Sequence, residues 1–224
     1  MIKSLDPEFV YLTHIHWDHF QGPSLRRIGK GKKIVIPKST SPRLRNDLIK
    51  MGFRDIVELK HGEQMKLGED FLITSYHFSP FLDSAVVIEA DGIKILNLND
   101  AKFMGWPLKQ IIDIHGDFDF VLRSHSSANS RLSYEFIDDL REDVDDLEYY
   151  IQNFRDTVQS VPAKYCVPFA SNQCHLHPEV ISFNGAARTP VLVREYFESQ
   201  KITQPELKVM VSGDSWSPQQ GFKL

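Results

Sequence analysis

The feature that most constrains this chain is a dense group of metal-binding side chains that directly follows an apolar run. Residues 9–13, with the sequence FVYLT, combine β-branched and aromatic side chains and are typical of a buried strand. The hexapeptide HIHWDH follows immediately at residues 14–19 and holds four potential ligands. Unrelated surface histidines rarely gather at this spacing behind a strand. The pattern therefore predicts a metal-binding loop at the end of a strand.

The spacing of these ligands indicates how they can share ions. Residues two apart on an extended backbone point in the same direction, so His14 and His16 can bind one metal ion. A turn that begins at Trp17 can direct Asp18 and His19 toward a second point nearby. Imidazole nitrogen combined with carboxylate oxygen suits Zn²⁺ first, then Fe²⁺ or Mn²⁺. We therefore expect one or two Zn²⁺ ions, with Mn²⁺ or Fe²⁺ as alternatives.

The rest of the chain predicts an α/β fold, because strands first alternate with helices and then form hairpins. A proline-opened helix at 23–28 and a helix at 41–51 flank a strand at 33–37, which is typical of parallel strands with covering helices. The dipeptide Asp91-Gly92 between two apolar runs signals a two-residue hairpin. Further strands are predicted at 56–59, 64–67, 71–74, 85–89, 93–96, 118–122, 164–168 and 207–212, and further helices at 107–114, 134–161 and 189–200.

Bulk properties narrow the class of protein. The net charge of −4 argues against a protein that binds nucleic acid by bulk electrostatics. No apolar run approaches the length of a membrane span, so no membrane association is expected. Two cysteines, Cys166 and Cys174, cannot form a disulfide framework, which makes the cytoplasm the expected compartment. We expect one domain over residues 1–224. The sequence does not decide between a monomer and a homo-oligomer.

The ligand motif carries a family resemblance. Residues 13–22, with the sequence THIHWDHFQG, resemble the signature THxHxDHxxG of the metallo-β-lactamase superfamily and match it at every defining position. The segment from Asp83 to Leu96 is most similar to the branch that holds CMP-N-acetylneuraminate hydroxylase and the ascorbate-phosphate lactonases. The segments at 165–170 and 177–178 also resemble the hydroxylase. The resemblance implies an αββα sandwich.

The resemblance also implies a ligand set. One metal ion would be bound by His14, His16 and His77, and Asp100 would lie between the two ions. The second ion would be bound by Asp18, His19 and a histidine late in the chain. That last ligand stays open among three candidates. His177 is the first choice because it follows a strand and a polar loop, and the others are His125 and His175.

Two departures from the family pattern affect these expectations. Only 13 residues precede His14, fewer than the family places before its first motif, so we expect a shortened chain that lacks part of the N-terminal sheet. The hydroxylase resemblance would also bring a Rieske iron–sulfur centre, which uses two cysteines and two histidines in short paired motifs. Neither Cys166 nor Cys174 stands in such a pair, so no Rieske centre is expected within this chain.

The function implied is that of a metal-dependent hydrolase. A metal-activated water would attack an ester, lactone or phosphodiester of a small anionic substrate, with Asp18 or Asp100 as the catalytic carboxylate. Lys102, Arg123 and Arg131 are candidates for holding the anion. Two alternatives remain: an oxidoreductase module with iron in the same pocket, and a non-catalytic remnant. Metal content distinguishes them.

Overall fold

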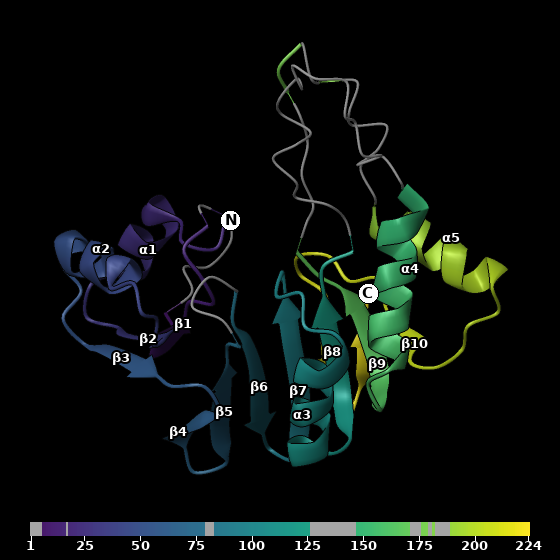
Figure 1. The fold of residues 1–224 in the computed structure, drawn as a ribbon, viewed down its shortest axis with the longest axis horizontal. Helices are drawn as coiled ribbons and strands as arrows, with labels where there is room; N and C mark the ends of the chain where they lie inside the picture. Colours follow the sequence, from purple (N-terminus) through teal and green to yellow (C-terminus); the bar gives the residue numbers. More distant parts are fainter. Residues whose placement is uncertain are drawn as a thin grey trace. The chain divides into compact units, whose positions relative to one another are not determined.

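A computed structural model of the chain describes residues 6–16, 18–78, 83–125, 147–170, 176–178, 181 and 189–224. The chain divides into two compact units, residues 1–103 and 104–224 (Figure 1). The expectation of one domain over 1–224 stays a prediction. No helix within the described ranges is long and apolar enough to cross a membrane.

The first unit begins with a small parallel sheet covered by two helices. Strands β1 (Phe9–Tyr11), β2 (Lys33–Pro37) and β3 (Ile56–Leu59) pair in the order β1-β2-β3. Helices α1 (Gly22–Ile28) and α2 (Arg43–Met51) connect them, and α2 ends at Gly52, whose φ of 98° suits glycine. The predicted alternation of strands and helices is confirmed over these residues.

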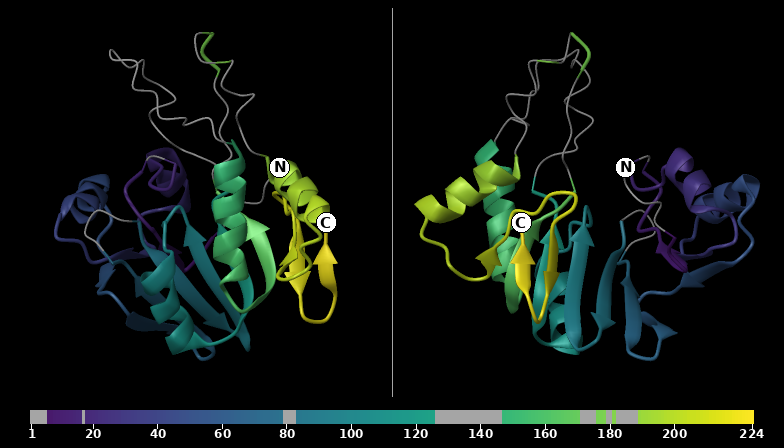
Figure 2. Two further views of the ribbon diagram at one scale, coloured as in Figure 1. Left: turned by 45° about the vertical axis from the view of Figure 1, so that its right-hand side comes forward. Right: turned by 180° about the vertical axis from the view of Figure 1, so that it is seen from behind.

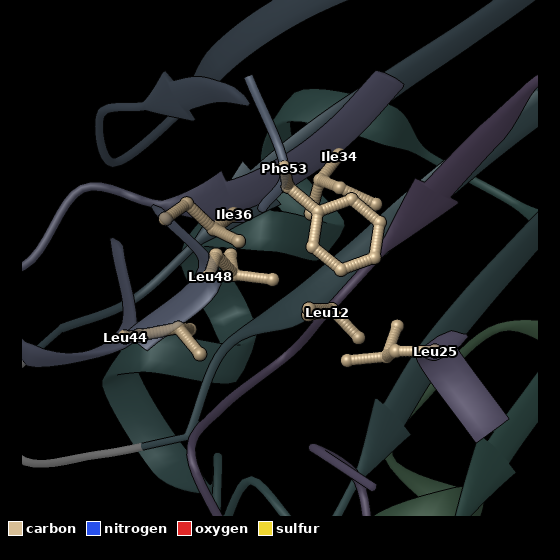
Figure 3. Packing of buried hydrophobic residues seen from close by; sticks show 7 residues of the cluster. All are labelled: Leu12, Leu25, Ile34, Ile36, Leu44, Leu48 and Phe53. Carbon is tan, nitrogen blue, oxygen red and sulfur yellow. The ribbon is translucent and has the colours of Figure 1, made fainter. Parts of the chain in front are cut away.

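A buried apolar cluster holds the helices against this sheet (Figure 3). Leu48 of α2 and Ile34 of β2 are fully buried in it, next to Phe53, which follows the helix. Full burial of each such side chain contributes about 1.5–3 kcal/mol to folding. The complete cluster consists of Leu12, Leu25, Ile34, Ile36, Leu44, Leu48 and Phe53. Leu12 lies just before residues 14–19, so this core fixes the start of the loop that the sequence predicts to bind metal.

The second sheet of the first unit is an antiparallel meander. It consists of β4 (Glu63–Gly68), β5 (Phe71–Tyr76), β6 (Ala85–Ala90) and β7 (Ile93–Asn99), paired in sequence order. Asp91 and Gly92 both have positive φ, at 50° and 76°, as the predicted tight hairpin between β6 and β7 requires. A second buried cluster packs the two sheets together and consists of Val35, Leu59, Ile73 and Val86. The first unit is therefore layered as helices, parallel sheet and antiparallel sheet.

The second unit contains a parallel sheet with helices and a C-terminal hairpin. Its elements are α3 (Gly105–His115), β8 (Phe118–Arg123), α4 (Leu147–Gln159), β9 (Ala163–Pro168), α5 (Pro190–Ser199), β10 (Glu206–Leu207), β11 (Ser215–Ser217) and β12 (Gly221–Lys223). Strands β8, β9 and β10 pair in parallel, as expected from their separation by helices. Of the helix predicted over 134–161, the part before residue 147 lies outside the described residues.

The predicted strand at 207–212 is wrong beyond Leu207. Strand β10 ends there, one residue before the last hydrogen bond to β9, from the Lys208 N–H to the Cys166 carbonyl. The chain then turns at residues 211–214, where the Asp214 carboxylate accepts a hydrogen bond from the Val211 N–H and the Asp214 N–H donates to the Val211 carbonyl. The hairpin of β11 and β12, drawn in yellow in Figure 2, was not predicted. Its Trp216 packs edge-on to Phe120 of β8, with ring centroids 4.9 Å apart.

The thiol of Cys166 lies within β9 and is shielded from solvent. Burial raises its pKa to about 12, so at about pH 8 only about one molecule in 10⁴ carries the reactive thiolate. In a Cys174→Ser variant we therefore expect no reaction of the native protein with a disulfide reagent such as DTNB, and one reactive thiol after unfolding in urea. Rapid labelling of the native variant would contradict this placement. The same burial makes Cys166 unsuitable as a ligand for an added metal or cluster.

Candidate metal centre

His14 is the side chain around which the candidate site is organised. It lies two residues beyond Leu12, whose N–H donates to the Val35 carbonyl. The backbone hydrogen bonds between β1 and β2 therefore fix the position of His14. The imidazole is only 7% exposed, and its Nδ1 lies 2.9 Å from the Thr13 hydroxyl. Its Nε2 is buried and has no hydrogen-bond partner among the residues that the structure describes. Because an unsatisfied buried nitrogen costs free energy, this atom fits a metal ligand better than a structural histidine.

The electrostatic surroundings keep His14 in the form that binds cations. Burial, assisted by the neighbouring imidazoles of His19 and His16, lowers the pKa of His14 to about 4. At neutral pH the ring is therefore uncharged. A proton on Nδ1, shared with Thr13, then leaves the lone pair of Nε2 available, as a metal ligand requires.

The first group of potential ligands consists of His14, His16 and Asp83, whose donor atoms lie within 4.8 Å of one another. His14 Nε2 is 3.7 Å from Asp83 Oδ1, and the rings of His14 and His16 meet edge to face with centroids 4.7 Å apart. Burial raises the pKa of the Asp83 carboxyl, an effect that a bound cation would offset. This group places two imidazoles and one carboxylate around one point.

The second group consists of His14, His19 and Asp100, again within 4.8 Å. A turn brings His19 back toward the strand end, with the N–H groups of His19 and Phe20 both donating to the His16 carbonyl. His19 Nε2 lies 3.1 Å from Asp100 Oδ2, and this hydrogen bond raises the pKa of His19. The predicted turn after His16 thus produces the second ligand point.

Asp18 is near the second group but outside both. Its Oδ2 is 3.5 Å from His19 Nε2, and its side chain is 44% exposed, compared with 17% for Asp100. Asp100 follows β7 directly, and its N–H donates to the side chain of Asn99 at 2.7 Å. Asp18 is therefore the carboxylate most open to solvent at this site.

His77 is not brought into either group. It follows β5 as expected, but its Nε2 donates to the Leu59 carbonyl at 3.3 Å, and its backbone N–H donates to His61 Nδ1 at 3.2 Å. A carbonyl only accepts hydrogen bonds, so this nitrogen of His77 carries the proton of the hydrogen bond to Leu59. The first group thus contains Asp83 and not His77, and a ligand role for His77 stays a prediction.

Asp83 is a candidate ligand that the sequence does not predict. In the sequence it stands out only as the start of a segment that resembles the hydroxylase branch. A signal was present: Asp83 lies two residues before the start of strand β6, and Asp100 directly follows the neighbouring strand β7. Because these strands are antiparallel, the end of β7 lies beside the start of β6, with Val86 opposite Asn97.

The late histidine stays a prediction. His125 and His177 belong to the second unit, while His175 lies outside the described residues. Of the candidate anion-binding residues, Lys102 is exposed and close enough to Asp83 to lower its pKa, against the larger effect of burial. Arg123 ends β8 in the second unit, and Arg131 lies outside the described residues.

Sequence comparison links the chain to iron–sulfur proteins. No family profile matches it. It is 25% identical over 219 residues to a Mycolicibacterium smegmatis protein named as a Rieske 2Fe–2S iron–sulfur protein, covering 91% of this chain and 41% of that protein. A Mycobacterium tuberculosis protein with the same description is 27% identical over 198 residues, covering 82% of this chain and 37% of that one. The chain thus spans about two fifths of the relatives it matches.

Structural comparison identifies the fold. CmlA β-hydroxylase superposes with a TM-score of 0.62 at 17% identity, covering 92% of this chain and 44% of that chain. A Veillonella parvula protein described as a possible metal-dependent hydrolase gives a TM-score of 0.59 at 15% identity, covering 92% and 74%. An isothiocyanate hydrolase from Delia radicum gut bacteria gives 0.56 at 16% identity, with the same coverage. Proteins with this architecture include metal-dependent hydrolases and a hydroxylase, and the chain has the metallo-β-lactamase fold.

Proposed function

We propose that this chain binds one or two divalent cations at His14, His16, His19, Asp83 and Asp100 and acts as a metal-dependent hydrolase. The substrate class we infer is a small anionic ester, lactone or phosphodiester. The observation that carries the proposal is the buried Nε2 of His14, which makes no hydrogen bond to any described residue while His14 belongs to both ligand groups. Each group offers two imidazoles and one carboxylate, a donor set that catalytic zinc sites use.

The chemistry divides between the cation and the chain. A cation bound there supplies Lewis acidity and lowers the pKa of a coordinated water toward about 7. Asp18 has an exposed carboxylate beside His19 and is the group best placed to accept a proton from an attacking water. Asp100 is less exposed and would bind the cation together with His19, in place of the hydrogen bond that the two side chains share without it. The positive charge of Lys102 near Asp83 favours an anionic substrate.

A second candidate function is that of an iron-dependent oxidoreductase module. The observation that favours it is the similarity to proteins named as Rieske iron–sulfur proteins, of which this chain matches only a part. Two histidines and one carboxylate are also the donor set of many non-haem Fe²⁺ oxygenases. In this case a partner would supply the electrons, because neither cysteine of this chain stands in a Rieske pair.

Metal analysis combined with paired assays tests the proposal. The purified chain is stripped with a chelator, reloaded with Zn²⁺, Mn²⁺ or Fe²⁺, and assayed on a phosphodiester and a lactone without any reductant. We expect turnover with Zn²⁺ or Mn²⁺ that the His14→Ala variant lacks. Activity that requires Fe²⁺, dioxygen and an electron donor would replace the hydrolase by the oxidoreductase. Failure to bind any of the three cations would overturn both and leave a non-catalytic protein.

A further inference from the structure

Each of three ligands in the first unit has a polar neighbour in sequence that takes part in one buried hydrogen-bond network. Thr13 precedes His14, Ser84 follows Asp83, and Asn99 precedes Asp100. Ser84 and Asn99 are almost completely inaccessible to solvent. These neighbours come from three segments that are far apart in the sequence. Their contacts therefore determine how the ligand-bearing segments lie relative to one another.

Ser84 is the residue that joins the three segments. Its hydroxyl donates to the Thr13 carbonyl at 2.7 Å, and its N–H donates to the same carbonyl at 3.3 Å. Its own carbonyl accepts a hydrogen bond of 2.8 Å from the side-chain amide of Asn99. Hydrogen bonds thus connect Ser84 to the segment that carries His14 on one side and to the segment that carries Asp100 on the other.

The hydroxyl groups around Ser84 can be oriented in one consistent order. The Ser84 hydroxyl donates its single hydrogen to the Thr13 carbonyl. In the hydrogen bond of 3.0 Å between the Ser84 and Tyr11 hydroxyls, the Ser84 oxygen must therefore accept. The Tyr11 hydroxyl then donates to Ser84, and the Ser75 hydroxyl, 2.7 Å away, donates to Tyr11. Burial raises the pKa of Tyr11, which keeps its proton in place. Every hydroxyl in this chain of hydrogen bonds therefore uses its single proton.

Asn99 completes the network from the other side. Its Nδ2 donates to the Ser84 carbonyl, while its Oδ1 accepts from the Asp100 N–H at 2.7 Å. Its backbone has a φ of 38°, in the left-handed region that asparagine tolerates better than most residues. The side chain thus fixes the turn that presents the Asp100 carboxylate to His19.

We propose that Ser84 and Asn99 are positioning residues that hold His14, Asp83 and Asp100 at the spacing required for cation binding. This inference rests on the proposed function, since it assumes that these three residues bind a cation. Residues that orient metal ligands through hydrogen bonds typically change metal affinity by about 10–100-fold when they are removed. The network predicts an effect of this size although neither side chain contacts the cation.

Cobalt binding tests this role, because Co²⁺ reports both affinity and ligand geometry through its visible spectrum. We expect Ser84→Ala to weaken Co²⁺ binding by about 10–100-fold and to change the spectrum of the bound ion. Asn99→Gly is the second variant, since glycine accepts the positive φ but lacks both side-chain hydrogen bonds. We expect a loss of similar size, and this variant keeps the test decisive if Ser84→Ala does not fold.

The control is Ile73→Val, which removes one buried methylene from the inter-sheet cluster and no hydrogen bond. We expect it to lower the urea midpoint of the metal-free protein while its Co²⁺ affinity and spectrum match the wild type. The inference is overturned if Ser84→Ala and Asn99→Gly behave like Ile73→Val. A wild-type chain that binds no Co²⁺ would overturn the proposed function together with this inference. A wild type that binds Co²⁺, beside network variants that bind equally well, would overturn this inference alone.

Discussion

Replacing His14 by alanine is expected to abolish cation binding, because this histidine belongs to both ligand groups. The loss should exceed the roughly 10–100-fold that substitutions outside the ligand shell cause. At a cation concentration of 100 times its dissociation constant, the wild type should gain about 2.7 kcal/mol of stability, and the variant should gain none. Urea unfolding with and without Zn²⁺ measures this difference.

His61→Ala is the matched control for this substitution. His61 is an exposed imidazole of the same unit that belongs to neither ligand group, and its Nδ1 lies 3.0 Å from the His77 carbonyl and 3.2 Å from the His77 backbone nitrogen. We expect the cation-dependent gain in stability to be unchanged in this variant. A His14→Ala protein that is stabilised by Zn²⁺ as strongly as the wild type would show that the orphaned Nε2 has no ligand role.

The second large effect concerns the choice between Asp83 and His77. Asp83→Ala removes the only carboxylate of the first group and should lower cation stoichiometry or affinity strongly. His77→Ala removes a ring whose Nε2 already donates to a backbone carbonyl, so cation binding should be retained. Elemental analysis of the two purified variants, reloaded under identical conditions, gives the comparison. The reverse result would return His77 to the ligand position that the family resemblance implied.

A third variant at this position tests metal preference. Asp83→His converts the first group into three imidazoles, which are softer donors than a carboxylate and suit Zn²⁺ better than Mn²⁺. We expect the ratio of Zn²⁺ to Mn²⁺ affinity to rise relative to the wild type, as measured by competition with a chelator. An unchanged ratio would mean that Asp83 does not touch the ion.

Local chemistry was sufficient to predict much of the first unit. Helix α2 has an apolar face and a glycine stop, and the hairpin at Asp91-Gly92 needs two residues with positive φ. Such signals depend on neighbouring residues alone. The ligand loop belongs to the same class, because its strand and its turn are both encoded within a dozen residues.

Features that depend on contacts distant in sequence were harder to predict. Asp83 becomes a candidate ligand only because β6 and β7 pair in a register that sets its segment beside Asp100 and the loop of His14. The hairpin of β11 and β12 is similar, since its strands are short and Trp216 gains its packing from Phe120, almost one hundred residues earlier. Sequence periodicity over three residues carries too little information to reveal such a pairing.

The position of the ligands has a mechanical consequence for the first unit. His14 follows a strand of the parallel sheet, whereas Asp83 and Asp100 border strands of the antiparallel sheet. An ion bound by His14 and either carboxylate would therefore cross-link the two sheets. Such a cross-link closes long loops of the chain and thereby stabilises the folded unit, because closing a long loop costs conformational entropy. Removal of the ion by a chelator should then let the two sheets separate more readily, which would increase the rate of proteolysis within residues 14–100.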